Sequence, residues 1–249
     1  MTISEMHYDF KMKLNKVDSN QNRNLLVPEI DWVLNEAQEL FIKMIAQPRQ
    51  NHYLGFEKSQ RSIDDIRMLV VSDREVNIDP NTKIAKLPED PTDLEKYLFY
   101  LKADVLMEKT NGSCKGSKDM GRLYIRQHDD DFENSPFDNS NFEWRTVNGL
   151  FIDGGVKVFD DSTFTNKSLL LSYIRKPKYI NNAKAFKGGN YQLPSGINVN
   201  PSVNQTVNCE LSEHTHREIV DIAVLIVTGS IQIPDYQVKL SKLNFNELN

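Results

Sequence analysis

The chain has 249 residues, of which 39% are hydrophobic and 26% are charged, and its formal net charge is −5. This composition is typical of a globular protein with a sizeable core, and it excludes a disordered or collagen-like chain. The longest uninterrupted apolar run, residues 222–227, is far shorter than the ~20 residues that cross a bilayer, and the mild acidic balance argues against general affinity for the nucleic-acid backbone.

Two helices are predicted near the N-terminus. In the first, Met6, Phe10 and Leu14 recur at fourfold spacing. In the second, residues 29–46, the apolar side chains follow the i, i+3, i+4, i+7 pattern of one helical stripe, with a proline near each end. The large apolar residues outside this stripe are Trp32, Leu40 and Ile42. They predict a second contact partner for this helix.

A third helix is predicted over residues 56–71. Its apolar face carries Ile63, Ile66, Leu69 and Val70. From residue 72 onward, frequent glycines and prolines divide the chain into short pieces rich in Tyr, Phe, Val and Ile, which is typical of an antiparallel β region. The best hairpin lies in residues 150–159, where Asp153 and Gly154 are expected to adopt the positive φ of a tight turn. Further strands are predicted at residues 122–126 and 167–177.

The last part of the chain changes character twice. Residues 181–209 are rich in Asn and contain no acidic residue, and we predict a long extended loop there. The last helix is predicted within residues 212–231, with Ser212 or Thr215 as its N-cap. Apolar residues run almost all round this helix, which predicts that it is buried. The tail, residues 233–249, is apolar enough to predict a terminal arm that lies on a surface.

Together these elements predict an α+β fold, in which a helical platform carries an inserted antiparallel β domain, either a sandwich or a barrel. The N-terminal helices and the C-terminal helix are expected to pack together in the platform. The predicted boundaries are 1–75 and 210–232 for the helical platform, 76–180 for the inserted β domain, 181–209 for the long extended loop and 233–249 for the C-terminal arm.

Two groups of polar residues are candidates for metal sites, and neither has the required spacing. Residues 128–131, His-Asp-Asp-Asp, do not match a calcium-binding loop, so we interpret them as a solvated loop. His214 and His216 would lie about 200° apart on a helix, where they cannot share one metal with Cys209 and Glu213. The sequence also lacks nucleophile, phosphate-loop and dinucleotide motifs. We therefore predict no catalytic residue, no cofactor and no metal.

Five segments, taken in order, resemble a known family. They read EMHYDFKMKLNKVDS, PEIDWVLNEAQELFI, GFEKSQRSIDDIRML, LLLSYIRKPKYI and ELSEHTHREIVDIAVLI. In this order they resemble the head-to-tail connector (ring) proteins of crAss-like bacteriophages. That family is similar in architecture to the adaptor, or tail tubular, proteins of short-tailed phages. The resemblance covers most of the chain.

The resemblance implies a virion structural protein, with no enzymatic activity, that forms a ring of about twelve copies below the portal vertex. Such a ring links the capsid to the tail around the DNA channel. The implied partners are further copies of the chain, the portal protein and neighbouring connector or tail proteins, while double-stranded DNA passes through without specific binding. Because the N-terminus lacks the basic-then-apolar order of a secretory signal, synthesis and assembly are expected in the host cytoplasm, without a membrane partner.

The surplus apolar residues are predicted to contact neighbouring subunits. The candidate interface residues are Trp32, Leu40, Ile42, Ile222, Leu225, Ile226, Tyr236, Val238, Leu240 and Phe245. Two alternatives stay open. The first is a carbohydrate- or receptor-binding β domain of a tail appendage, with Phe137, Phe142 and Trp144 as its platform. The second is a hydrolase built on the acidic residues 129–131.

Overall fold

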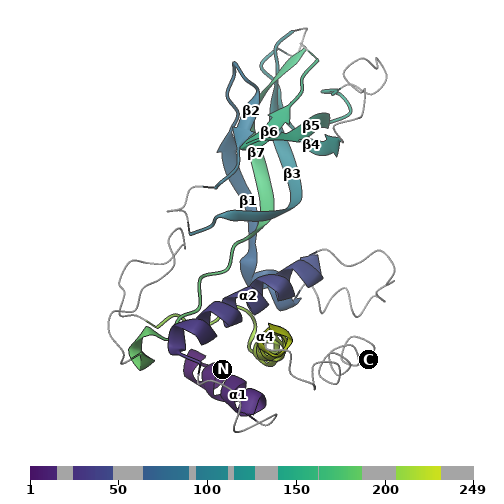
Figure 1. The fold of residues 1–249 in the computed structure, drawn as a ribbon. Coiled ribbons are helices and arrows are strands. Elements are labelled where there is room, and N and C mark those ends of the chain that lie inside the picture. Colours follow the sequence, from purple (N-terminus) through teal and green to yellow (C-terminus); the bar gives the residue numbers. More distant parts are fainter. Residues whose placement is uncertain are drawn as a thin grey trace, which may run out of the picture. The chain divides into compact units, whose positions relative to one another are not determined.

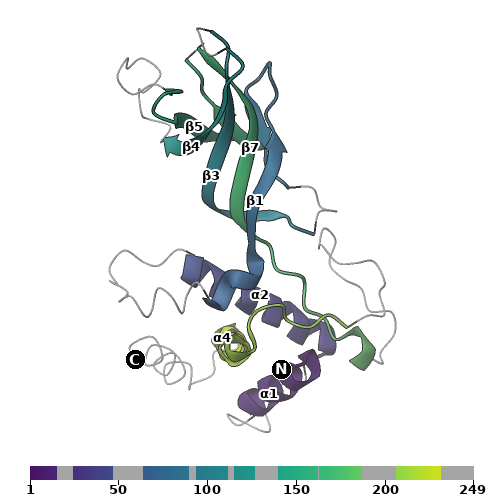
Figure 2. The same ribbon diagram turned by 180° about the vertical axis from the view of Figure 1, so that it is seen from behind.

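The computed structural model describes residues 1–15, 25–46, 64–89, 94–111, 115–126, 140–161, 163–186 and 206–230. The chain divides into two compact units, drawn in Figures 1 and 2. The helical unit comprises Met1–Leu69 and Pro177–Asn249, and the sheet unit comprises Val70–Lys176. In the sequence, the sheet unit is thus inserted into the helical unit. The α+β fold predicted from the sequence is confirmed.

The helical unit contains α1 (Ile3–Asn15), α2 (Val27–Ala46) and α4 (His216–Ser230). Helix α4 packs against both α1 and α2. The buried side chains include Met6, Phe10 and Leu14 on α1, Ile30, Leu34, Ala37, Phe41 and Ile42 on α2, and Ile219, Val220, Ala223 and Val227 on α4. The predicted apolar face of α1 and the predicted burial of the last helix are therefore confirmed, and the predicted stripe of α2 is buried or partly buried except towards its C-terminal end, where Met44 is 47% exposed. None of the described helices combines the length and the hydropathy that spanning a membrane requires.

The third predicted helix ends earlier than expected. Residues 64–66 are helical and continue into a 3-10 turn, η1 (Arg67–Leu69), and Val70 then begins strand β1 (Val70–Asn77). Val70 and Val71 pair with a neighbouring strand, a position that suits β-branched side chains. The prediction that Val70 shares a helical face with Leu69 is therefore wrong. Residues 51–63 lie outside the described residues.

The start of the last helix also differs from the prediction. A 3-10 turn, η4 (Glu213–Thr215), precedes α4, and Ser212 is its N-cap but makes no side-chain capping hydrogen bond. The Thr215 hydroxyl donates to the Ser212 carbonyl oxygen at 2.8 Å, so it faces backwards along the chain. Neither hydroxyl accepts a capping bond from the first turn of α4, and the tight 3-10 turn itself satisfies part of this helix end.

The sheet unit is built on a seven-stranded sheet with the strand order β1-β7-β3-β4-β5-β6-β2. The further strands are β2 (Ile84–Lys86), β3 (Tyr97–Lys109), β4 (Lys118–Arg126), β5 (Thr146–Ile152), β6 (Gly155–Val158) and β7 (Phe164–Arg175). Neighbouring strands are antiparallel except β4 and β5, which are parallel and depart from the predicted antiparallel arrangement. The sheet curls into a half-barrel (Figure 1), and a bridge between Ile78 and Ala85 links its two edges.

The core of the sheet unit is made by side chains that point to one side of the curled sheet. They are Ala103, Val105 and Met107 on β3, Leu123 on β4, Val147 on β5, Val156 and Val158 on β6, and Phe164, Leu169, Leu171 and Tyr173 on β7. On β3 these residues alternate with less buried ones, as the period of a strand requires. The strand predicted at residues 122–126 lies within β4, and the one predicted at 167–177 overlaps β7, which starts three residues earlier and ends at Arg175.

The predicted hairpin is present as β5 and β6, with Ile152 paired to Gly155 across the turn. Only Gly154 has a positive φ, 74°, so the expectation that Asp153 also adopts one is wrong. The turn is thus compatible with an ordinary residue at its first central position. Gly155 lies so close to β2 that an added Cβ would be 2.5 Å from the Ala85 carbonyl oxygen. This close backbone approach requires a glycine.

The segment that follows the sheet unit is described in part. It contains a 3-10 turn, η3 (Ala183–Ala185), and Asn181 forms an isolated antiparallel bridge with Val207. Residues 187–205 of the predicted loop lie outside the described residues, as does the predicted arm at 233–249.

Candidate functional site

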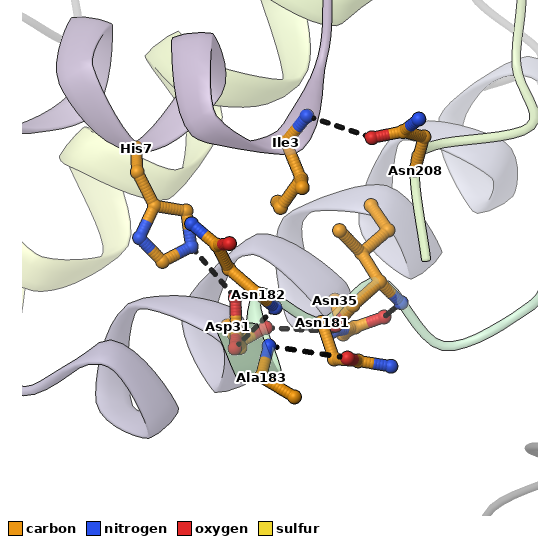
Figure 3. A network of polar contacts seen from close by, with 9 residues as sticks. Ile3, His7, Asp31, Asn35, Asn181, Asn182, Ala183 and Asn208 are labelled. Carbon is orange, nitrogen blue, oxygen red and sulfur yellow. Dashed lines mark hydrogen bonds and ion pairs between the residues drawn. The ribbon is translucent and has the colours of Figure 1, made fainter. Parts of the chain in front are cut away.

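A row of polar residues on α2 faces the chain segment that returns from the sheet unit. Asp31, Asn35 and Gln38 are spaced i, i+4 and i+7, so they lie on one side of the helix. Each contacts the backbone of residues 178–182. Figure 3 shows Asp31 and Asn35 in this network. Helix α2 therefore holds this segment by its main chain.

Asn35 binds both backbone groups of Ile180. Its Nδ2 donates to the Ile180 carbonyl oxygen at 2.8 Å, and its Oδ1 accepts the Ile180 N–H at 2.8 Å. Ile180 is completely shielded from solvent, with 0% exposure. Because water cannot replace these bonds, the amide of Asn35 supplies the partners that a neighbouring strand would otherwise provide.

Asp31 joins three parts of the helical unit. Its carboxylate has no exposed surface, and His7 Nε2 on α1 lies 2.6 Å from Asp31 Oδ1 (Figure 3). The other oxygen, Oδ2, accepts the Asn182 N–H at 3.0 Å. A buried carboxylate is costly unless its oxygens are bonded. The two bonds therefore link α1, α2 and the returning segment at one point.

Gln38 extends the row by one turn. Its Nε2 donates to the Lys178 carbonyl oxygen at 3.3 Å, and its Oε1 accepts from Cys209 Sγ at 3.4 Å. Lys178 is also held by an ion pair with Glu210 at 2.6 Å. The chain at both ends of the predicted loop thus meets the same face of α2.

Asp31, Asn35 and Gln38 are not among the residues predicted from the sequence. The signal was three polar residues at i, i+4 and i+7 beside the apolar stripe of α2, a pattern that also fits a solvated face. Residues 178–182 cover this polar side of α2, and only their position shows that it lies in the interior of the helical unit.

The four residues weighed as a zinc set each have a different partner. Cys209 donates to Gln38, and Glu213 binds the Met1 amine at 2.9 Å. The ring of His214 pairs with Asp65, and His216 Nε2 donates to the Leu211 carbonyl oxygen at 2.9 Å. Within the part of the chain that is described, no group of three potential ligands converges.

Burial controls the chemistry of two of these groups. It raises the pKa of the Cys209 thiol to about 12, so the reactive thiolate is rare at neutral pH. Burial also lowers the pKa of His216, and the neighbouring Met1 amine acts in the same direction. Both groups are therefore neutral constituents of the core rather than a nucleophile or a charged ligand.

The outer face of α2 exposes large apolar side chains. The exposed fractions are 54% for Trp32, 38% for Leu40 and 47% for Met44. With the exposed Glu36 they recur every four residues and form a row, which we call the α2 face. Ile42, in contrast, is completely buried within its own chain, so in this conformation it has no surface to offer to a neighbour.

Helix α1 exposes a second apolar surface. Tyr8 is 68% exposed and Met12 is 44% exposed, and they lie four residues apart on one side of α1. Lys11 is exposed between them in the sequence. We call Tyr8, Lys11 and Met12 the α1 face. A shallow hollow beside Tyr8 is lined partly by Arg217 from the start of α4.

The aromatic residues considered as a carbohydrate platform are separated in the sheet unit. Phe142 is half-buried and packs against Phe164, with ring centroids 6.2 Å apart. Trp144, two residues later, is 76% exposed. Phe137 and the acidic residues 129–131 lie outside the described residues. Phe142 therefore belongs to the margin of the core and does not share an exposed platform with Trp144.

Comparison with protein families gives the assignment. Residues 1–234 match the model of phage tail ring protein 3/4 of crAss phages. The chain belongs to this tail ring protein family. The resemblance inferred from the sequence is thereby confirmed, and the family is structural rather than enzymatic. A search of curated proteins finds no match.

As a tail ring protein, the chain is part of the virion and assembles with copies of itself. The residues predicted for subunit contacts are distributed unevenly. Trp32 and Leu40 are exposed on α2, and Leu225 and Ile226 on α4 are partly exposed. Ile222 is 7% exposed and belongs, with Ile42, to the core of the helical unit. The predicted arm contacts, Tyr236, Val238, Leu240 and Phe245, lie outside the described residues.

Proposed function

We propose that this tail ring protein forms one ring of the head-to-tail connector below the portal vertex, with about twelve copies that link the capsid to the tail. The observation that carries the proposal is the pair of exposed apolar faces on α1 and α2 in a chain whose family forms rings. A ring needs two different surfaces on every copy, because each subunit contacts one neighbour with one surface and the next neighbour with the other. Exposed apolar patches on separate helices meet that need.

We also propose that Trp32, Leu40, Leu225 and Ile226 take part in contacts between subunits. All four retain exposed surface in the single chain. We assign the C-terminal arm, residues 233–249, to the same task, because its spaced apolar residues, Tyr236, Val238, Leu240 and Phe245, need a surface to cover them. The portal protein and the neighbouring connector or tail proteins would contact the two rims of the ring.

In this proposal, double-stranded DNA passes through the ring without specific binding. Acidic residues outnumber basic residues by 35 to 30, and a mildly acidic passage repels phosphates over short distances. Fluorescence anisotropy with a labelled duplex at physiological salt should therefore detect no binding tighter than about 100 µM. Tight, strongly salt-dependent binding would contradict this part of the proposal.

A symmetric cryo-EM reconstruction of the neck of purified virions tests the main proposal. We expect a closed ring of about twelve subunits on the portal axis, with this chain assigned by its side-chain density. The proposal fails if the chain is located away from that axis, or in isolated copies. A glycan-array signal that is lost in Trp144→Ala would instead favour the carbohydrate-binding alternative.

A further inference from the structure

We infer that neighbouring copies in the ring meet through the α2 face of one copy and the α1 face of the next, with Glu36 of one copy paired to Lys11 of the other. The inference rests on the proposed ring and names the two surfaces that close it. The occupant of each face is therefore a second copy of this chain.

The α2 face has the shape of a helix-packing ridge. Trp32, Glu36, Leu40 and Met44 follow the i±4 row, and the distance along the helix from Trp32 to Met44 is about 18 Å. Three of the four side chains are apolar and between 38% and 54% exposed. Such a contiguous apolar row with one central charge is unusual on a surface that stays in water, and it is typical of a contact surface.

The α1 face is shorter and complementary in chemistry. Tyr8 and Met12 are four residues apart and are 68% and 44% exposed. Their separation along the axis, about 6 Å, equals one step of the α2 row. An aromatic ring and a flexible thioether adapt well to a neighbouring apolar ridge. Lys11 places a positive charge at this face, and Arg217 places another beside the hollow next to Tyr8.

The charges on the two faces are opposite, and neither has a partner in the part of the chain that the structure describes. Among the described residues, neither Glu36 nor Lys11 has a hydrogen-bond or ion-pair partner, although charged residues close to them in the same helices do. Lys13 pairs with Asp9 at 2.9 Å and Asp221 at 2.7 Å. Glu39 lies 4.0 Å from Lys43. The one acidic side chain within the apolar row of α2 thus has a cationic counterpart on α1, which favours a head-to-tail contact over a contact of either face with itself.

Charge reversal tests the pairing in the full chain. Lys11→Glu and Glu36→Lys each place like charges opposite each other, so each should weaken ring assembly by at least about tenfold, measured by mass photometry over a concentration series. The double variant restores opposite charges and should recover most of the assembly. Glu75→Lys, the same charge change at an exposed position of β1, is the matched control and should assemble like the unchanged chain.

Disulfide trapping gives a readout that also detects weak association. One pool carries Lys11→Cys, a second pool carries Glu36→Cys, and both carry serine in place of the two native cysteines. Mixing the pools under mild oxidation should yield a cross-linked dimer, whereas Lys11→Cys with Glu75→Cys should not. The inference is overturned if the 11–36 pair cross-links no better than this control, or if the double charge variant assembles no better than the single ones. If both tests fail but the reconstruction of the neck shows a closed ring of this chain, the proposed function still holds. Only the contact between the α1 face and the α2 face is then excluded.

Discussion

Replacing Asn35 with alanine should lower the stability of the helical unit by about 2–4 kcal/mol. The amide makes two hydrogen bonds to the backbone of Ile180, and each is worth about 1 kcal/mol net. Ile180 has 0% exposure, so its N–H and carbonyl groups lose their partners in a place that water reaches poorly. Each buried group left unpaired costs about 1–3 kcal/mol, which sets the upper part of the range.

The two tryptophans give each unit its own reporter, because Trp32 lies on α2 and Trp144 lies in the sheet unit. Urea unfolding of Asn35→Ala in a Trp144→Phe background should show the expected loss in the fluorescence of Trp32. Hydrogen exchange adds a local measurement. The amide of Ile180, which donates to Asn35, should exchange faster in the variant by a factor that matches the loss of stability.

Glu39→Ala is the control on the same helix. Glu39 is exposed, and its ion pair with Lys43 is long, so the substitution should change the free energy of unfolding by less than about 0.5 kcal/mol. The reasoning is refuted if Asn35→Ala costs no more than this control and leaves the exchange of the Ile180 amide unchanged.

Four further predictions concern separate features of the chain. Gly155→Ala puts a methyl group 2.5 Å from the Ala85 carbonyl oxygen and should destabilise the sheet unit by about 1–3 kcal/mol in urea unfolding. Burial lowers the pKa of His216, so the unfolded chain binds the proton more readily than the folded chain. The free energy of unfolding should therefore fall as the pH drops below about 6.5. His216→Gln should flatten this dependence of the unfolding free energy on pH. Burial also raises the pKa of the Cys209 thiol to about 12, so in a chain without the other cysteine it should react with a disulfide reagent at pH 8 about 1,000-fold more slowly when native than when unfolded in urea. Removing residues 235–249 should reduce ring assembly in mass photometry while leaving the urea midpoint unchanged, and normal assembly of the truncated chain would contradict the role assigned to the arm.

The elements that could be predicted from the sequence are those whose signal is local. The apolar stripe of α2 repeats within 20 residues, and the nearly continuous apolar composition of α4 indicates burial without any knowledge of its neighbours. The hairpin of β5 and β6 depends on a turn of two residues, Asp153 and Gly154. In each case a short stretch of chain carries all the information that the prediction needs.

The features that could not be predicted depend on residues far apart in the sequence. Asn35 and Ile180 are separated by 145 positions, and Asp31 and Asn182 by 151. A polar residue on a helix has the same pattern whether it faces water or a buried backbone. The end of the third helix has the same cause, because Val70 is drawn into a strand by pairing with β7 about 100 residues later.

Asn35 and Glu36 are adjacent on α2 but point about 100° apart, so they lie on two sides of the helix that have different roles. On one side, Asn35 holds the returning segment through hydrogen bonds inside the chain. Asn35→Ala should therefore lower the free energy of unfolding of a protein kept monomeric by dilution. Glu36 has no partner among the residues that the structure describes, so Glu36→Lys should leave the monomer as stable as before and reduce assembly alone. Measuring urea midpoints and ring formation for both variants separates these effects. Equal losses of stability from the two substitutions would mean that the outer side of α2 packs within the monomer. Its apolar row would then not be a contact surface between copies.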